Sequence, residues 1–321
     1  MCSAGNFSGR IGDLIDMSSP RRTGSSSPPT AAQKRLAAQR ATAARARIVA
    51  AQRRRRIWTV VTSVGTVVVL VLALVVVKVV TNAGSSKSGP KATAASQSVA
   101  QAVATIPAAA FDAAGAGSGT TAPRALKGAA LTANGKPRVL FIGGEFCPYC
   151  AAERWPLAVA LSRFGALHGL GQTSSSANDV YPSTPTLSFH RATYSSRYLS
   201  FTGKEAQSNK IQGNSYAPLD QISPADQALW KQIGGNSYPF LDIGGRWVSV
   251  EAAYSPQLLH GMTHAQVAHA LSDTGSKVGQ TILGAANEVT AAICTLTHDE
   301  PASVCTSTGV KAAATKLSNG S

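Results

Sequence analysis

Cysteine, aromatic residues and acidic residues are all scarce in this chain of 321 residues. It has five cysteines, its aromatic content is 6%, and 15 acidic residues stand against 30 lysines and arginines. Only Cys147 and Cys150 are closely spaced, and Cys294 and Cys305 do not form a second close pair, which argues against a structural zinc site. Haem attachment requires a histidine directly after the second cysteine, and Ala151 stands there instead.

Other signatures of catalysis are also missing. The chain has no glycine-rich phosphate loop, no dinucleotide fingerprint and no Ser-His-Asp order, so nucleotide and hydrolase chemistry have no support. His260 and His264 have the i, i+4 spacing of a metal pair, but no carboxylate is spaced to complete a site, and they are interpreted as exposed helix residues. His168 and His190 are isolated in the sequence. We therefore expect neither a metal nor a small cofactor.

The positive charge is concentrated in the first 56 residues. This segment holds twelve basic and two acidic residues and so carries +10 of the net charge of +15. It has no interleaved aromatic residues and no nucleic-acid-binding motif, so nucleic acid is not an expected partner. Basic charge beside an apolar segment is explained by membrane topology and by attraction to anionic lipid.

A long apolar run follows the basic tail. Residues 57–80 are nearly unbroken in hydrophobicity, with Lys78 as the one charged residue. As a helix, 24 residues extend about 36 Å, enough to cross the hydrocarbon core of a bilayer. Arg53 to Arg56 directly precede the run, and the positive-inside rule places that side in the cytoplasm. We expect a single-pass protein with a cytoplasmic N-terminus in a cell membrane.

The remaining chain divides into a linker and a folded domain. Residues 81–122 are rich in Ala, Gly, Ser and Thr and predict a flexible linker, within which a short helix around 97–111 is compatible with the sequence. Residues 123–315 predict an α/β domain. The expected elements are a buried strand at 138–144, a helix at 150–165, a strand within 184–201, a helix at 223–234, a hairpin with strands 240–243 and 246–251 around two glycines, and helices at 263–273 and 282–296.

The two pairs of cysteines have different surroundings. A strand ending at Gly144 would deliver Cys147 to a helix N-terminus, where the helix dipole favours a thiolate, and Pro148 suits the first turn. Cys150, deeper in the helix, would then resolve the mixed disulfide. Cys294 and Cys305 flank a short loop, and we interpret them as a structural disulfide, with a second redox pair as the alternative.

The phrases around the cysteines resemble known families. Cys147-Pro148-Tyr149-Cys150 is the motif seen in glutaredoxins, and its place before a helix, with Tyr238-Pro239 before a later hairpin, is similar to the thioredoxin-like fold. "FIGGEFCPYCAAERWPLAVALSRFG", "YPSTPTLSFHRATYSSRYLSF" and "YPFLDIGGRW" resemble the membrane-anchored family known as domain of unknown function 929, over roughly residues 105–315.

This resemblance implies an architecture and a substrate-binding face. It implies a central mixed sheet flanked by helices, with a C-terminal helical extension, preceded here by the single transmembrane helix. It also implies that Pro239 has a cis peptide bond and lies against the dithiol. Tyr238, Pro239, Pro148 and Tyr149 are then the expected substrate-binding residues.

The sequence departs from thioredoxins in one respect. Thioredoxins carry a buried carboxylate about where Phe141 stands here, and that carboxylate assists proton transfer from the resolving thiol. We interpret Glu145 as a solvated loop charge and Glu153 as a helix-surface residue that pairs with a basic neighbour. Neither is expected to take over the missing role.

Together these features predict a membrane-anchored, extracytoplasmic thiol–disulfide oxidoreductase. Its substrates would be cysteine-containing exported proteins, and a membrane or extracytoplasmic redox partner would reset the dithiol. An oxidase or isomerase is favoured over a reductase because the expected compartment is oxidising. The alternative is a non-catalytic cell-envelope interaction module in which Cys147 and Cys150 form a permanent structural disulfide.

Overall fold

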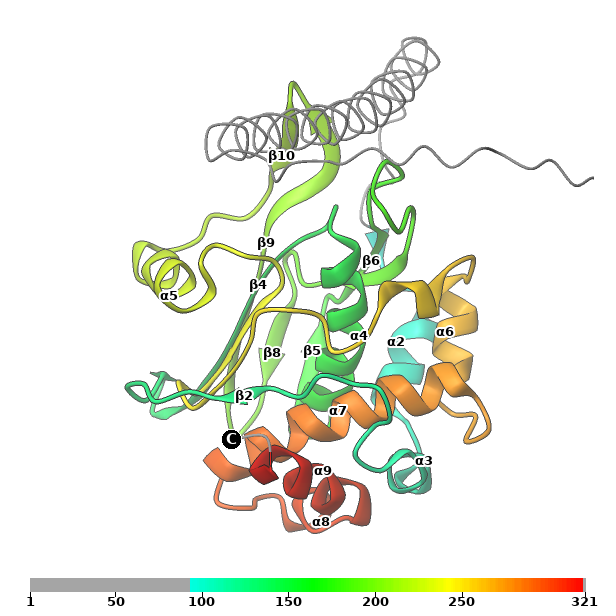
Figure 1. Cartoon of the computed structure of the whole chain (residues 1–321), viewed down its shortest axis with the longest axis vertical. Helices are drawn as coiled ribbons and strands as arrows, with labels where there is room; N and C mark the ends of the chain where they lie inside the picture. Colours follow the sequence, from blue (N-terminus) through cyan, green and yellow to red (C-terminus); the bar gives the residue numbers. More distant parts are fainter. Residues whose placement is uncertain (1–92, 320–321) are drawn as a thin grey trace, which may run out of the picture. The chain divides into compact units, whose positions relative to one another are not determined.

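The central strand of the fold ends at the cysteine motif. The computed structural model of the chain describes residues 93–319, and in it β4 (Lys136–Gly144) runs through the middle of the main sheet (Figure 1). β4 pairs in parallel with β9 (Ser200–Gln212) on one side and antiparallel with β11 (Phe240–Ile243) on the other. The molecule is therefore a mixed α/β structure built on a central mixed sheet.

The main sheet has short strands at both edges. Its order is β10-β9-β4-β11-β12-β2, and β3 pairs with β4 outside this path. Two small sheets, of order β1-β6-β7 and β5-β8, lie beside it. The strands not yet given are β1 (Thr93–Ala94), β2 (Arg124–Ala125), β3 (Thr132–Ala133), β5 (Ala166–His168), β6 (Gly171–Ser174), β7 (Pro185–Ser188), β8 (Thr193–Ser195), β10 (Ser215–Pro218) and β12 (Trp247–Ser249).

Alternation along β4 supplies two hydrophobic cores. Val139 and Phe141 belong to the larger core with the long helices, whereas Leu140 and Ile142 pack with Trp230 in a smaller core. Successive side chains of a strand point to opposite faces, so one apolar run serves both faces of the sheet. Figure 1 shows α4 (Pro148–Ser162) and α5 (Pro224–Gly234) on opposite sides of β4.

Helix α4 is buried along almost its whole length. Every residue from Cys150 to Leu161 is buried, and the helix continues through Pro156. It contacts β7, α7 (Lys277–Leu296) and the 3-10 helix η1 (Pro256–Leu259). A helix that is apolar on all sides requires this enclosure. Within α4 only Tyr149, between the cysteines, is exposed, and Ser162 at the other end is partly exposed.

The remaining helices largely follow the sequence signals. Ser223 caps α5 and the helix ends before Gly235, which has φ 60°, as the sequence predicted. The predicted C-terminal helices correspond to α6 (His264–Ala270) and α7. Beyond them lie α8 (Ala302–Cys305) and α9 (Thr308–Asn319), and the Cys294–Cys305 disulfide joins α7 to α8 as expected.

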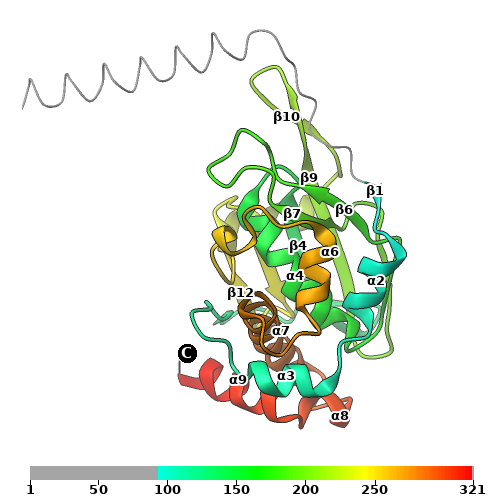
Figure 2. The same cartoon turned by 90° about the vertical axis from the view of Figure 1, so that its right-hand side faces the viewer.

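The structure differs from the predicted linker over residues 93–122. This stretch forms β1, α2 (Gln97–Ala104) and α3 (Ala108–Ala114), and Val99, Val103 and Phe111 are buried in the larger core. Figure 2 shows α2 beside α6 and α3 beside α7. The low content of large apolar groups predicted poor burial, but alanines let these helices approach closely enough for a few larger side chains to pack.

The structure also differs in two strand assignments. The single strand predicted within 184–201 is divided into β7, β8 and the start of β9, and β9 then runs on to Gln212. In the hairpin, Ile243 pairs with Trp247, so the turn has three residues rather than two. Gly244 and Gly245 still carry positive φ, and a Cβ on Gly245 would lie 2.0 Å from the carbonyl oxygen of Ala129.

The expected membrane segment is not part of the described structure. The expected cytoplasmic tail at 1–56 and the expected span at 57–80 both lie outside residues 93–319. Among the helices of residues 93–319, none has the length and apolar character needed to cross a bilayer.

Replacing Phe111 tests whether its segment is part of the folded domain. The Phe111 ring lies 4.1 Å from the guanidinium carbon of Arg163, and its carbonyl oxygen accepts a hydrogen bond from Asn287. We expect Phe111→Ala to lower the free energy of unfolding by about 3 to 5 kcal/mol in chemical denaturation of the full chain in detergent micelles. Ala113→Ser, an exposed change in the same helix, is the control. Equal stability of the two variants would restore the linker interpretation.

Candidate functional site

The two cysteines of the motif lie at the junction of β4 and α4. Cys147 is the N-cap of α4, and its Sγ accepts a hydrogen bond from the backbone nitrogen of Cys150 at 3.2 Å. Both are free thiols, and their exposed fractions are 6% for Cys147 and 0% for Cys150. Strand β4 thus presents Cys147 at the helix N-terminus, as the sequence predicted.

The environments of the two thiols push their pKa values apart. A hydrogen bond from the Cys150 thiol lowers the pKa of Cys147, and it is joined by backbone N–H groups of the first helical turn and by the charge of Arg154, against the effect of burial. Burial raises the pKa of Cys150 well above its ordinary value. Cys147 is therefore the thiol that ionises first, and Cys150 keeps its proton.

Aromatic residues surround the dithiol. Tyr149, between the cysteines, is 42% exposed, and its ring meets Tyr181 edge-on at 5.9 Å. On another side the ring of Phe146 stacks on Tyr216 at 4.1 Å and meets Tyr238 edge-on at 5.9 Å. Pro148, the other expected binding residue within the motif, is buried and occupies the first position of α4.

The peptide bond of the distant Tyr-Pro pair has the expected cis form. The Tyr238–Pro239 peptide bond is cis and directly precedes β11, and Pro239 is buried. Burial raises the pKa of Tyr238, and negative charge on Cys150 and Cys147 raises it further. The phenol is therefore close enough to the dithiol to respond to its charge.

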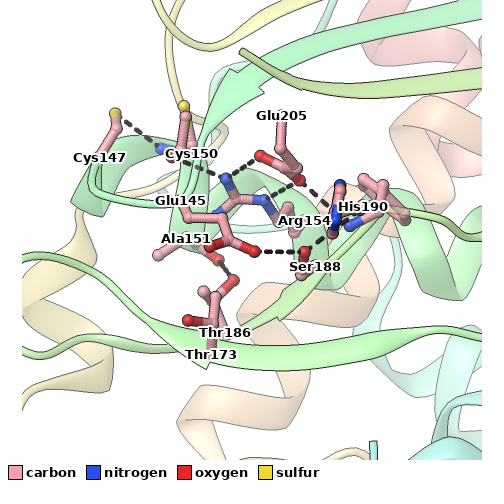
Figure 3. Close-up of polar contacts among 12 residues, drawn as sticks. Glu145, Cys147, Cys150, Ala151, Arg154, Thr173, Thr186, Ser188, His190 and Glu205 are labelled. Atoms are coloured by element: carbon pink, nitrogen blue, oxygen red, sulfur yellow. Dashed lines mark hydrogen bonds and ion pairs between the residues drawn. The ribbon is translucent and has the colours of Figure 1, made fainter. Parts of the chain in front are cut away.

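A buried ion pair lies behind the dithiol. Arg154 follows Cys150 by one helical turn, is fully buried, and binds Glu205 of β9 through Nε at 2.8 Å and Nη2 at 2.6 Å (Figure 3). Its Nη2 also donates to the carbonyl oxygen of Gly144 at 2.8 Å. Burial opposes the charge on Arg154, but Glu205 outweighs this and raises the pKa of the guanidinium. The sequence analysis missed both residues.

A hydrogen-bonded network continues beyond Glu205. Its Oε1 also accepts a hydrogen bond from the backbone of Phe189, and its own backbone nitrogen donates to Asp220. Asp220 in turn lies 2.7 Å from Nδ1 of His190. The sequence suggested that His190 is isolated, but it is not. The fold brings together the segment after β7, which carries His190, and the segment after β10, which carries Asp220.

Glu145 is buried, contrary to the predicted solvated loop charge. It is 2% exposed, and its Oε1 accepts a hydrogen bond from the Ser188 hydroxyl at 2.7 Å. Burial raises the pKa of the Glu145 carboxyl. With Ser188, His190 and Lys210 it lines a cavity of about 510 Å³. The loop turns inward because the backbone nitrogen of Glu145 pairs with Gln207 of β9.

Glu153 is also buried, contrary to the predicted surface pair. It is 1% exposed, and its Oε2 accepts a hydrogen bond from the backbone nitrogen of Ala253 at 2.8 Å. Burial raises the pKa of Glu153 to about 8. The helical period alone could not show this, because other elements cover the outer face of α4.

The two histidines considered for a metal do not share a helix. His260 follows η1 and is exposed, whereas His264 is the first residue of α6. The Nε2 of His264 lies 2.6 Å from the carbonyl oxygen of Thr173 and so serves a structural contact. The i, i+4 spacing predicted a common helical face, and the backbone at Gly261 to Thr263 removes it.

One sequence signal pointed to the buried arginine. Arg154 is the one basic residue of the largely apolar helix α4, four residues after Cys150, and a buried charge is costly unless it is paired. Its partner, Glu205, is 51 residues away in a strand that no hydrophobic pattern marks.

Replacing Glu153 tests the pH dependence that its burial implies. Its pKa rises from 4.5 to about 8 on folding, so the native state binds the proton more tightly than the unfolded state. Its contribution to stability is complete below pH 4.5 and is lost as the pH rises toward 8, by at most about 1.4 kcal/mol per pH unit. We compare the free energy of unfolding of Glu153→Gln with that of the wild type in denaturant titrations. Between pH 5 and pH 8 we expect this difference to change by about 2 to 4 kcal/mol in favour of the variant. A difference that stays constant with pH would contradict the shifted pKa.

Comparison with known proteins identifies a family without a known activity. No curated protein and no solved structure matches the chain. A family model, described as a domain of unknown function (DUF929), matches residues 124–295, which include the cysteine motif, β9 and the Tyr-Pro pair. This match covers more than half of the chain and agrees with the resemblance seen in the sequence. The chain belongs to the DUF929 family.

Proposed function

We propose that the chain is a thiol–disulfide oxidoreductase that acts on protein cysteines through Cys147 and Cys150, in a thioredoxin-like arrangement. The observation that carries the proposal is the asymmetry of the two thiols. Cys147 caps a helix with its pKa lowered, while Cys150 is fully buried with its pKa raised. Attack requires a thiolate and resolution requires a second thiol within reach, and this pair meets both requirements.

The exchange reaction uses the two cysteines in turn. In the oxidised protein a substrate thiolate attacks Sγ of Cys147, and the electron pair of the broken S–S bond leaves on Cys150, which takes up a proton. A second substrate thiolate then attacks the substrate sulfur of the mixed disulfide and expels the Cys147 thiolate. The substrate gains a disulfide and loses two electrons, and the protein gains a dithiol.

The aromatic surroundings support a polypeptide substrate. Tyr149 is exposed beside Cys147, and Val180, next to the Tyr181 that contacts it, is 68% exposed. Tyr238 and Pro239 would lie along an extended substrate segment whose backbone pairs with the chain before β11. Aromatic and aliphatic side chains offer contact area to an unfolded segment at low entropic cost. Pro148 and Tyr149 would complete this binding face.

The cellular setting is proposed from the sequence. The apolar run 57–80 would anchor the domain in the cell membrane with the N-terminus in the cytoplasm and the dithiol outside. Cysteine-containing exported proteins would be substrates, the lipid bilayer a partner, and a membrane or extracytoplasmic redox protein would reset the dithiol. An oxidase or isomerase suits this compartment better than a reductase.

Cysteine variants of the full chain in detergent micelles test the proposal. We expect the wild type to reach a defined dithiol–disulfide equilibrium in glutathione buffers and to catalyse insulin reduction or refolding of a reduced substrate. Cys147→Ser removes this activity by a factor of 100 or more, on the order of losing an essential nucleophile. Cys150→Ser, with the attacking thiol intact, accumulates mixed disulfides that Cys147→Ser does not.

The same experiment distinguishes the alternative function. A Cys147–Cys150 disulfide that persists under strong reductant and supports no exchange indicates a structural crosslink. In that case the domain is a non-catalytic envelope interaction module. Mixed disulfides trapped through Cys150→Ser are incompatible with that alternative.

A further inference from the structure

A buried positive charge lies behind the dithiol. Arg154 lies one turn after Cys150 on the same face of α4, and its guanidinium is fully buried between the dithiol and Glu205 (Figure 3). The positive charge of this guanidinium lowers the pKa of Cys147 and opposes the effect of burial on the pKa of Cys150. A buried charge is poorly screened, so this interaction persists at physiological salt.

Glu205 binds the Nε and Nη2 atoms of Arg154 but not Nη1. The carboxylate accepts hydrogen bonds from Nε and Nη2, and the carbonyl oxygen of Gly144 accepts a second hydrogen bond from Nη2. Within residues 93–319, Nη1 is buried and has no hydrogen-bond partner. Glu205 also accepts a hydrogen bond from the backbone nitrogen of Phe189. The guanidinium of Arg154 lies between Glu205 and the dithiol, and its charge acts on Cys147.

Other titratable groups also lie near Arg154. Burial raises the pKa of the Glu145 carboxyl, and its hydrogen bond from Ser188 and the charge of Arg154 oppose this. Tyr238 beside the dithiol has its pKa raised and stays neutral. His190 belongs to the pair with Asp220, on the far side of Glu205. Because Cys147 is the thiol that ionises first, the thiolate stabilised by the Arg154 charge is the one that forms at Cys147.

We propose that Arg154 is a positioning residue whose buried positive charge stabilises the Cys147 thiolate, so that the dithiol form is favoured and electrons flow from substrate thiols to this protein. The inference rests on the proposed function and adds its direction. A better-stabilised thiolate is a better leaving group, and a disulfide whose reduced form is stabilised is a stronger oxidant. In the reaction above, Arg154 acts when the second substrate thiolate expels Cys147.

Opposite charge changes within the ion pair give opposite results. Glu205→Gln keeps an oxygen for Arg154 and removes the negative charge, so the Cys147 thiolate becomes more stable. Arg154→Met with Glu205→Met replaces the whole pair by apolar side chains of similar length, a kind of change that buried ion pairs tolerate. There the thiolate becomes less stable. Arg154→Lys keeps the charge and is the conservative control.

The readout is the pH dependence of Cys147 alkylation in the reduced full chain, followed by peptide mass spectrometry. We expect the pKa of Cys147 to increase in the order Glu205→Gln, wild type, double Met variant, with a roughly tenfold difference in thiolate fraction between the ends. Arg154→Lys stays within about twofold of the wild type. The same tenfold factor makes the disulfide of the double variant about 30 mV less oxidising than that of Glu205→Gln in glutathione buffers.

A merely structural role for the pair predicts another pattern. Glu205→Gln and the double Met variant would then both loosen the junction of β4 and α4. They would shift the Cys147 pKa in the same direction or leave it unchanged, and either result overturns the inference. Tryptophan fluorescence, to which the buried Trp155 and Trp230 contribute, reports whether each variant is folded. If the double variant does not fold, Glu205→Gln decides alone, since an unchanged or raised Cys147 pKa rejects the proposal.

The outcome also separates this inference from the proposed function. Alkylation needs no exchange reaction, so the order of pKa values can be measured even in a protein that exchanges nothing. The expected order without glutathione exchange in the wild type would reject the oxidoreductase and with it the electron flow. Exchange without the expected order would reject the role of Arg154 alone.

Discussion

The buried ion pair between Arg154 and Glu205 holds together the three elements that make the candidate site. Arg154 comes from α4, Glu205 from β9, and the carbonyl oxygen of Gly144 from the end of β4. Two charges that are fully removed from water must be paired and hydrogen-bonded, and leaving either one alone is strongly destabilising. The pair therefore fixes how the helix that carries the dithiol leaves the sheet, and it does so directly behind Cys150.

Other buried acidic residues also join distant segments of the domain. Acidic residues are few in this chain, yet several of them are buried and tie distant segments together. Glu153 fixes α4 to the backbone of Ala253, and Glu288 of α7 binds both Thr120 and Lys316, which join the segment before β2 to α9. Burial raises the pKa values of both carboxyls, to about 8 for Glu153, so Glu153 keeps its proton at neutral pH, whereas the ion pair with Lys316 opposes the shift at Glu288.

The enclosure of α4 has a consequence for access. Helices α2 and α7 and the 3-10 helix η1 contact it outside the sheet, so no side of the helix is open along its length. The proposed substrate would meet the dithiol at the N-terminal end of the helix, where Cys147 is 6% and Tyr149 is 42% exposed. The additional helices around the sheet thus confine the proposed chemistry to one sulfur atom, while Cys150 stays protected until Cys147 has reacted.

Local patterns in the sequence determined the elements whose side chains are uniformly apolar or whose ends are capped. They predicted β4, α5 with its Ser223 cap, the hairpin at Gly244-Gly245, and the place of Cys147 at a strand–helix junction. These features depend on neighbours in the sequence, so the sequence alone contains them. The predicted membrane span at 57–80 lies outside the described residues and stays a prediction.

Only the tertiary structure decided what surrounds the dithiol. β9 carries a buried glutamate where a core strand usually carries an apolar residue, so no hydrophobic pattern marks it, and its meaning depends on an arginine 51 residues away. Glu145 and Glu153 were interpreted as solvated because charge is normally exposed, and residues 93–122 as a linker because alanine and glycine bury little area. In each case the deciding contact joins segments far apart in the chain, and the free energy that stabilises it exists only after they have met.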